Sequence, residues 1–176
     1  SALRGTKLYG NPDRYRRCVN DVNRLLARKG RGAGVSITLA DYQDSRLSPL
    51  RSEDLLRAAR EHESNPFVSV LAGRMEALVE EHAPDAVGVS LNYLSQALSA
   101  FAMIGLARDR FPRMVTVLGG GLVTSWLRQT GGRNPFTGLI DHCVAGPGEG
   151  FLLGLAGLSA GDEGFVRPDY GGFPAE

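Results

Sequence analysis

Three short apolar segments of this chain each lead into glycine or small polar residues and then into a stretch of helical character. They are residues 86–91, residues 114–118 and the strand-like segment that precedes residues 143–150. This alternation is typical of an α/β protein, whose ligands bind outside the carboxyl ends of its parallel strands. We therefore expect a binding crevice formed by the residues at these three ends. They are Ser90, Asn92, Tyr93, Gly119, Gly120, Gly121, Gly146, Gly148 and Glu149.

The glycine triplet at residues 119–121 is the centre of this expectation. Consecutive glycines leave no side chains at a strand end, so a large flat or anionic ligand can approach the backbone closely. Other interpretations stay open. The triplet is also compatible with a tight turn that holds no ligand. Ser90 and Asn92 are compatible with capping the next helix, and Glu149 with an acid that favours a helix N-terminus.

The composition predicts one globular domain. A chain of 176 residues, 43% of them hydrophobic, can bury a core without disulfides or metals. Its two cysteines, Cys18 and Cys143, form no C-x-x-C pair, which suits a reducing cytoplasm. The net charge of +1 predicts neither nucleic acid nor an anionic membrane as a partner. No apolar run is long enough for a membrane span, and the N-terminus shows no signal-peptide pattern.

The apolar periodicity predicts the elements in more detail. Helices are expected at residues 11–30, 52–62, 72–82, 95–111, 122–128 and 148–158, and strands at residues 35–40, 86–91, 114–118 and just before residue 143. This order predicts a doubly wound parallel sheet of the Rossmann-like or flavodoxin-like type, with helices on both faces in three α/β/α layers. The strand at residues 86–91 should be central and adjacent to residues 114–118. Ser90 and Gly119 should then face the same crevice.

Both ends of the sequence depart from a standard domain of this type. A doubly wound domain usually opens on a strand, but here a helix comes first. Either residues 2–9 form an irregular strand or, as we expect, the first strand precedes this sequence. Residues 165–176 are extended and punctuated by proline and glycine, which predicts a linker. The expected organisation is an α/β domain at residues 1–164 followed by the start of a linker at residues 165–176.

Four motifs in the second half of the chain together resemble a known family. They are P-D-A-V-G-V-S at residues 84–90, L-G-G at residues 118–120, I-D-H-C-V-A-G-P-G-E-G at residues 140–150, and P-D-Y-G-G-F-P at residues 168–174. Their order and spacing resemble the cobalamin-binding N-terminal domain of cobalamin-dependent radical-SAM enzymes. The resemblance covers about half of the chain, residues 84–174.

The resemblance implies roles for the predicted site residues. In that family the nucleotide tail of the cofactor inserts between strand ends. Ser90 resembles the serine that faces the tail, and Gly119 and Gly120 resemble the glycine pair that lets it pass. Residues 146–149 resemble the last strand-end loop, whose amides could face the phosphate of the tail. Tyr93 could touch the corrin ring, and Asn92 stands where leucine is common in classical members.

The resemblance also implies how cobalt is held. The D-x-H-x-x-G loop whose histidine ligates cobalt in classical members is missing, and His62, His82 and His142 stand in other contexts. Cobalamin is therefore expected base-off, without a protein imidazole. A radical-SAM domain downstream in the same chain, with a [4Fe-4S] cluster and S-adenosylmethionine, would be its partner.

Two alternatives remain at this point. The first is a degenerate domain of the same fold that binds no cobalamin and acts as a structural or substrate-facing cap. The second is a flavodoxin-like module that binds a nucleotide or flavin phosphate, although no phosphate-cradling loop follows the first strand. The chain holds no C-x-x-x-C-x-x-C cluster motif and no nucleophile paired with a base. We therefore expect no turnover from this chain alone.

Overall fold

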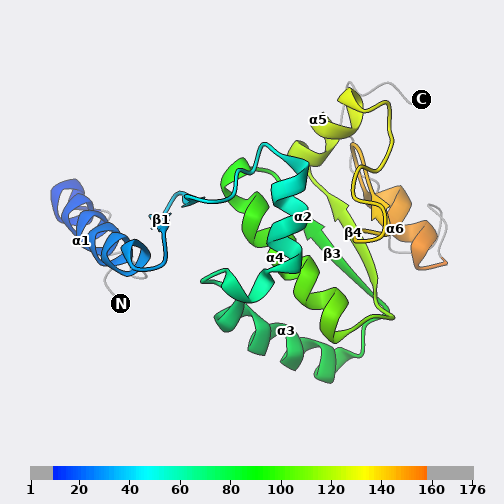
Figure 1. The fold of residues 1–176 in the computed structure, drawn as a ribbon, viewed down its shortest axis with the longest axis horizontal. Helices are drawn as coiled ribbons and strands as arrows, with labels where there is room; N and C mark the ends of the chain where they lie inside the picture. Colours follow the sequence, from blue (N-terminus) through cyan, green and yellow to red (C-terminus); the bar gives the residue numbers. More distant parts are fainter. Residues whose placement is uncertain (1–9, 158–176) are drawn as a thin grey trace.

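The structure is a computed structural model that describes residues 10–157. Figure 1 shows an α/β body and a separate N-terminal helix joined to it by a short hairpin. The expected linker at residues 165–176 and the expected end of the last helix at residue 158 lie outside the described residues. The helices are α1 Pro12–Arg31, α2 Ser52–Arg60, η3 His62–Ser64, α3 Val68–His82, α4 Leu94–Arg110, α5 Gly121–Gln129 and α6 Glu149–Leu155. The strands are β1 Val35–Ile37, β2 Tyr42–Asp44, β3 Ala86–Ser90, β4 Val115–Gly119 and β5 His142–Cys143.

The central feature of the body is a three-stranded parallel sheet flanked by helices, in the order β3-β4-β5. The expected parallel pairing of the first two of these strands is confirmed, with Ala86 opposite Val115 and Ser90 opposite Gly119. The expected central position of residues 86–91 is wrong for the described residues, because β5 pairs with the other edge of β4. The middle strand is therefore β4.

The strand expected at residues 35–40 is also different in the structure. It ends at Ile37, and β1 pairs antiparallel with β2 in a separate two-stranded sheet. The Thr38 hydroxyl accepts hydrogen bonds from the amides of Ala40 and Asp41, at 3.2 and 2.8 Å. The Thr38 amide donates to the Asp41 carbonyl at 2.9 Å. These local bonds close a turn that sends the chain back on itself, so this segment does not join the parallel sheet.

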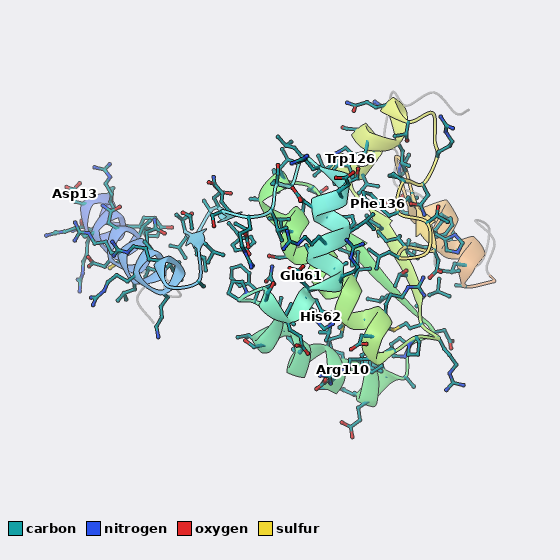
Figure 2. The ribbon with its side chains drawn as sticks, viewed as in Figure 1. Asp13, Glu61, His62, Arg110, Trp126 and Phe136 are labelled. Atoms are coloured by element: carbon teal, nitrogen blue, oxygen red, sulfur yellow. The ribbon has the colours of Figure 1, made fainter. Side chains whose placement is uncertain are left out.

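Helix α4 covers one face of the parallel sheet. Successive strand residues point to opposite faces, and Leu91 and Val89 belong to the core that α4 fills with Leu98 and Phe101. Phe136 meets the Phe101 ring edge-to-face, with centroids 4.6 Å apart. Figure 2 shows Trp126 beside Phe136 at one end of this core, and their centroids are 6.0 Å apart.

Helix α2 lies directly across α4 (Figure 1). The approach is close because α4 carries Gly105 at the crossing. A Cβ on Gly105 would lie 2.0 Å from the carbonyl oxygen of Ala59. Glycine is therefore required here by the helix–helix contact, although glycine is a poor helix former.

Several helices begin at other residues than the sequence predicts, and for α3 and α4 the side-chain contacts at the start give the reason. Helix α3 begins at Val68, four residues earlier than predicted. The Asn65 side chain accepts a hydrogen bond from the amide of Phe67 at 3.0 Å and so stabilises the turn that leads into the helix. Helix α4 begins at Leu94, and the expected cap Ser95 is already inside it. There the Gln96 side chain accepts from backbone amides that precede the helix.

Candidate ligand-binding site

A cavity of about 700 Å³ opens at the carboxyl ends of the three parallel strands, on the sheet face opposite α4. Its walls come from β3, β4, α5, the loop after β5 and α6. All but two of the predicted site residues line it. They are Ser90, Gly119, Gly120, Gly121, Gly146, Gly148 and Glu149. Asn92 and Tyr93 are not among the lining residues.

Bare backbone forms the floor of this cavity. Gly88 and Ser90 of β3 are exposed on this face, and in the register they stand opposite Val117 and Gly119 of β4. A Cβ on Gly88 would meet no atom within 4 Å, and one on Gly119 would come no nearer than 3.7 Å to the carbonyl oxygen of Val144. The space above Gly88 is therefore open, whereas a Cβ on Gly119 would be in ordinary van der Waals contact with Val144. A methyl group at either position would fit without striking the protein.

Gly120 has a different role from its neighbour. Its φ is 109°, and a Cβ there would lie 2.4 Å from the carbonyl oxygen of Leu91. The same carbonyl accepts from the amide of Leu122 at 3.2 Å. Gly120 is thus required by the turn between β4 and α5 whether or not a ligand is present.

Asn92 is a structural link between two elements of the site. Its Oδ1 accepts from the amide of Gly121, the first residue of α5, at 2.9 Å. Its Nδ2 donates to the hydroxyl of Ser90 at 3.2 Å. The capping interpretation therefore holds for Asn92, with the difference that it caps α5 and not the helix that follows it. Tyr93 is 67% exposed and precedes α4 outside the cavity.

Helix α5 lines the cavity with a polar stripe that the sequence analysis missed. The stripe has the spacing i, i+3, i+4, i+7 and consists of Gly121, Thr124, Ser125 and Arg128. The opposite side of the helix carries Val123 and Leu127, which are buried in the core. This spacing was readable in the sequence as one face of an amphipathic helix. What the sequence did not show is that the polar face borders a cavity.

Thr124 ties the third strand end to this helix. Its hydroxyl donates to the carbonyl of Gly120 at 3.0 Å and accepts from the amide of Gly146 at 2.9 Å. The loop after β5 is therefore held against α5 by one side chain. Gly146 itself has a φ of 71°, which glycine adopts readily.

Helix α5 contributes a basic group to the cavity, and helix α6 contributes an acidic group and apolar side chains. Arg128 of α5 is exposed, and its side chain makes no hydrogen bond or ion pair within residues 10–157. Glu149 is the first residue of α6, where a carboxylate is favoured by the helix dipole. Phe151 and Leu152 of α6 add apolar surface. This combination suits a ligand with an anionic group and a large apolar part.

None of the three histidines lines the cavity. The His142 ring packs on Phe151, with centroids 5.1 Å apart, and His62 is buried under α4, 3.9 Å from Asp109. Among the described residues no three His, Cys, Asp or Glu side chains gather into a metal site.

Cys143 offers no nucleophile to the cavity. Burial raises the pKa of its thiol to about 11, and the thiol donates to Oδ1 of Asn134 at 3.2 Å. A thiol with a raised pKa is mostly protonated at neutral pH and therefore unreactive. Within the described residues, the site has the groups needed to bind a ligand.

Compared with protein-family models, curated proteins and solved structures, this chain matches none at a significant level. The likeness to cobalamin-binding domains therefore rests on the four motifs and on the geometry of the cavity. Within residues 10–157, no helix has both the length and the apolar character that a bilayer crossing requires.

Proposed function

We propose that this chain is a cobalamin-binding module and that its cavity receives the nucleotide tail of the cofactor. The observation that carries the proposal is the open glycine floor, in which Gly88 and Gly119 leave bare backbone beside Ser90. A flat ring system can lie against such a floor at van der Waals distance. The fold we propose is the doubly wound, three-layer type, with β3, β4 and β5 as its inner part.

The residues of this chain would bind and orient the cofactor, which supplies the methyl or radical chemistry when bound. The Ser90 hydroxyl stands at the floor, where it can hydrogen-bond to the tail. Arg128 presents a guanidinium at the rim, which suits the phosphate of the tail. Because the D-x-H-x-x-G motif is missing from the sequence, we propose a base-off form without a protein imidazole.

We further propose that the parent protein is a cytoplasmic radical-SAM enzyme. Its [4Fe-4S] cluster and S-adenosylmethionine would be held by a downstream domain of the same chain. The support is the resemblance of residues 168–174 to the linker motif, together with cysteines that form no pair. Sequence downstream of residue 176 that contains C-x-x-x-C-x-x-C would support this assignment, and its absence would remove it.

The experiment fills the cavity without disturbing the fold. Gly88→Val places a β-branched side chain on an exposed strand position with no atom within 4 Å, where strand propensity favours it. Equilibrium dialysis with hydroxocobalamin measures retention, and a thermal melt of each variant measures folding. Gly73→Ala in α3 is the matched control, because its Cβ also meets nothing within 4 Å and lies outside the cavity.

We expect Gly88→Val to lose retention by at least tenfold while its melting temperature stays at or above that of the parent chain. The control should retain cobalamin fully. Unchanged retention in a folded Gly88→Val protein would show that the glycine floor is not the tail site. The degenerate-domain alternative would then be preferred.

A second candidate is a module that binds a nucleotide or flavin phosphate. It is favoured by Arg128, which has no partner within residues 10–157 and stands beside Ser125 on the polar stripe of α5. The same dialysis with flavin mononucleotide and with ATP distinguishes it. Binding of either with no retention of hydroxocobalamin would favour this second function.

For bound cob(II)alamin, nitrogen superhyperfine splitting from an axial protein ligand would contradict the histidine-free assignment and point to His142.

A further inference from the structure

The charge of this chain is strongly segregated. Helix α1 carries seven basic and two acidic residues, a net charge of +5, whereas the whole chain has a net charge of +1. The remainder of the molecule is therefore acidic. The net charge of the whole chain conceals this segregation. The expectation that neither nucleic acid nor an anionic membrane is a partner was drawn from that net charge, and it does not apply to α1. The seven basic residues are Arg14, Arg16, Arg17, Arg24, Arg28, Lys29 and Arg31.

Four of these arginines form a row along one face of the helix. They are separated by seven, four and three residues, which are close to whole turns of a helix, and all four are exposed. They are Arg17, Arg24, Arg28 and Arg31. At 1.5 Å per residue the row is roughly 21 Å long. Figure 1 shows that α1 stands apart from the α/β body, so an extended partner can reach this face.

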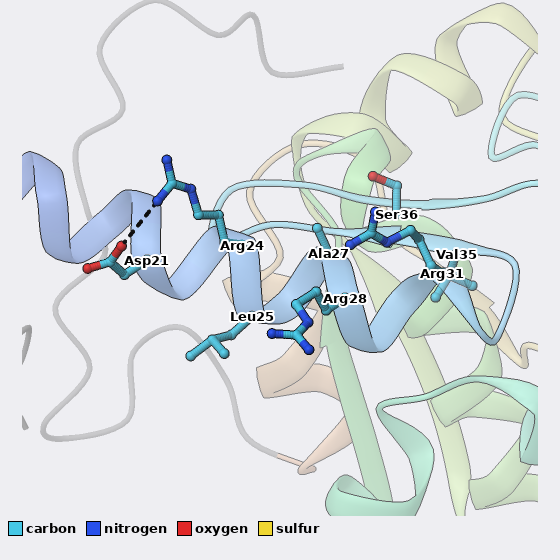
Figure 3. Close-up of a pocket in the computed structure, with 8 residues that line it drawn as sticks. All are labelled: Asp21, Arg24, Leu25, Ala27, Arg28, Arg31, Val35 and Ser36. Atoms are coloured by element: carbon cyan, nitrogen blue, oxygen red, sulfur yellow. Dashed lines mark ion pairs between the residues drawn. The ribbon is translucent and has the colours of Figure 1, made fainter.

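A groove of about 640 Å³ follows the second half of this row, between α1 and β1. Figure 3 shows Arg24, Arg28 and Arg31 along the helix, with Arg31 beside Val35 and Ser36. The Arg24 side chain lies 3.7 Å from Asp21, but both are largely exposed, and such pairs are worth little in water. The side chains of Arg28 and Arg31 make no hydrogen bond or ion pair within the described part of the chain. The groove therefore has at least two uncompensated guanidinium groups.

We propose that the arginine row of α1 binds the phosphate backbone of a nucleic acid, without reading its sequence. Six of the seven basic residues are arginines, whose planar guanidinium matches a phosphate with two parallel hydrogen bonds. Exposed Asn20 also lies on this face, between Arg17 and Arg24. The phosphate contacts of the arginines themselves carry no sequence information. A lipid surface fits less well, because the large apolar side chains that α1 exposes are limited to Tyr15 and Leu25. The acidic remainder of the molecule would face away from the polyanion.

The test is the salt dependence of binding, measured by fluorescence anisotropy. The probes are a labelled single-stranded RNA and a DNA of the same mixed sequence. Each single-strand phosphate contact contributes about −0.7 to the slope of log K against log salt, so four arginines predict a slope of about −3. Arg28→Gln/Arg31→Gln should reduce the slope to roughly half. Arg28→Lys/Arg31→Lys keeps both charges and should keep most of the slope.

The matched control is Arg74→Gln/Arg113→Gln. It removes the same net charge from two exposed arginines outside α1 that have no ion pair within residues 10–157. This control should bind as the parent chain does. Equal losses in the control and the α1 variant would overturn the proposal, and so would the absence of salt-dependent binding. Binding to anionic phosphatidylserine vesicles with none to either oligonucleotide would also overturn it and assign the helix to a membrane surface. The result is independent of cobalamin retention, because no residue of the row lines the sheet cavity.

Discussion

Asn92, two residues after the end of β3, holds the first turn of α5 through a 2.9 Å hydrogen bond from the amide of Gly121 to its Oδ1. The two residues are 29 positions apart. The bond joins the ends of two neighbouring strands at the rim of the candidate site. It also satisfies one of the amides that every helix leaves unpaired at its N-terminus. The orientation of the polar stripe on α5 therefore depends on a side chain that does not line the cavity.

Asn92→Ala should destabilise the chain by about 1 kcal/mol, the usual cost of a lost helix cap. Asn92→Asp retains the acceptor oxygen and should lose clearly less stability than Asn92→Ala, because a carboxylate also accepts hydrogen bonds from amides at a helix N-terminus. Urea unfolding of the three proteins measures the difference. Equal losses for Ala and Asp would show that the Gly121 bond does not contribute to stability.

Gly105→Ala should destabilise the protein by about 2 kcal/mol, the scale of overpacking a core. Alanine is the better helix former by roughly 1 kcal/mol, but its Cβ would strike the Ala59 carbonyl at 2.0 Å. Gly73→Ala in α3 adds the same methyl where no atom lies within 4 Å, and it should stabilise by about 0.5–1 kcal/mol. Thermal melts of both variants test the contrast. Shifts of the same sign would contradict the close approach of α2 and α4.

Arg128→Gln should weaken retention of hydroxocobalamin by roughly tenfold, the value of one charge-assisted hydrogen bond. Arg128→Lys should recover part of the affinity, because the charge remains. Stability should change little in either variant, since the side chain has no partner within residues 10–157. Equilibrium dialysis of the three proteins gives the answer. An unchanged affinity in Arg128→Gln would show that this arginine does not bind the ligand. The proposal that the ligand lies on the glycine floor would be unaffected.

Asp141 should make stability depend on acid pH. Burial raises the pKa of its carboxyl, but hydrogen bonds from the Thr116 amide, the Arg108 guanidinium and the Thr116 hydroxyl together lower it by more. The net pKa lies below the ordinary value. The carboxylate therefore stabilises the fold above the unfolded pKa of about 3.9, and this contribution is lost as the pH falls through the folded pKa.

The comparison is with Asp141→Asn. At about pH 7 the variant should be less stable than the parent chain, and the difference should shrink as the pH falls below about 4. Urea unfolding across this range measures both. A difference that stays constant down to about pH 2 would show that ionised Asp141 does not support the β4–β5 connection.

The sequence alone determined the local parts of this fold. The periodicity of α1 and α4 predicted both helices, because apolar spacing along a helix is a local property. The pairing of β3 with β4 also followed, since strands joined by one helix usually lie side by side. The glycines at residues 119–121 predicted the position of the cavity, because they mark the end of a strand in the sequence.

Only the tertiary structure decided where these parts meet. The β1–β2 hairpin and the middle position of β4 depend on which strands compete for each edge, and no local pattern records that competition. Gly119 and Gly120 are the same type of residue, yet a Cβ on Gly119 would make only ordinary contacts with Val144, whereas a Cβ on Gly120 would strike the Leu91 carbonyl. Their difference arises from φ and from a neighbour 29 residues away. Contacts between distant segments are set by packing, and so the sequence located the candidate site without showing which residues face it.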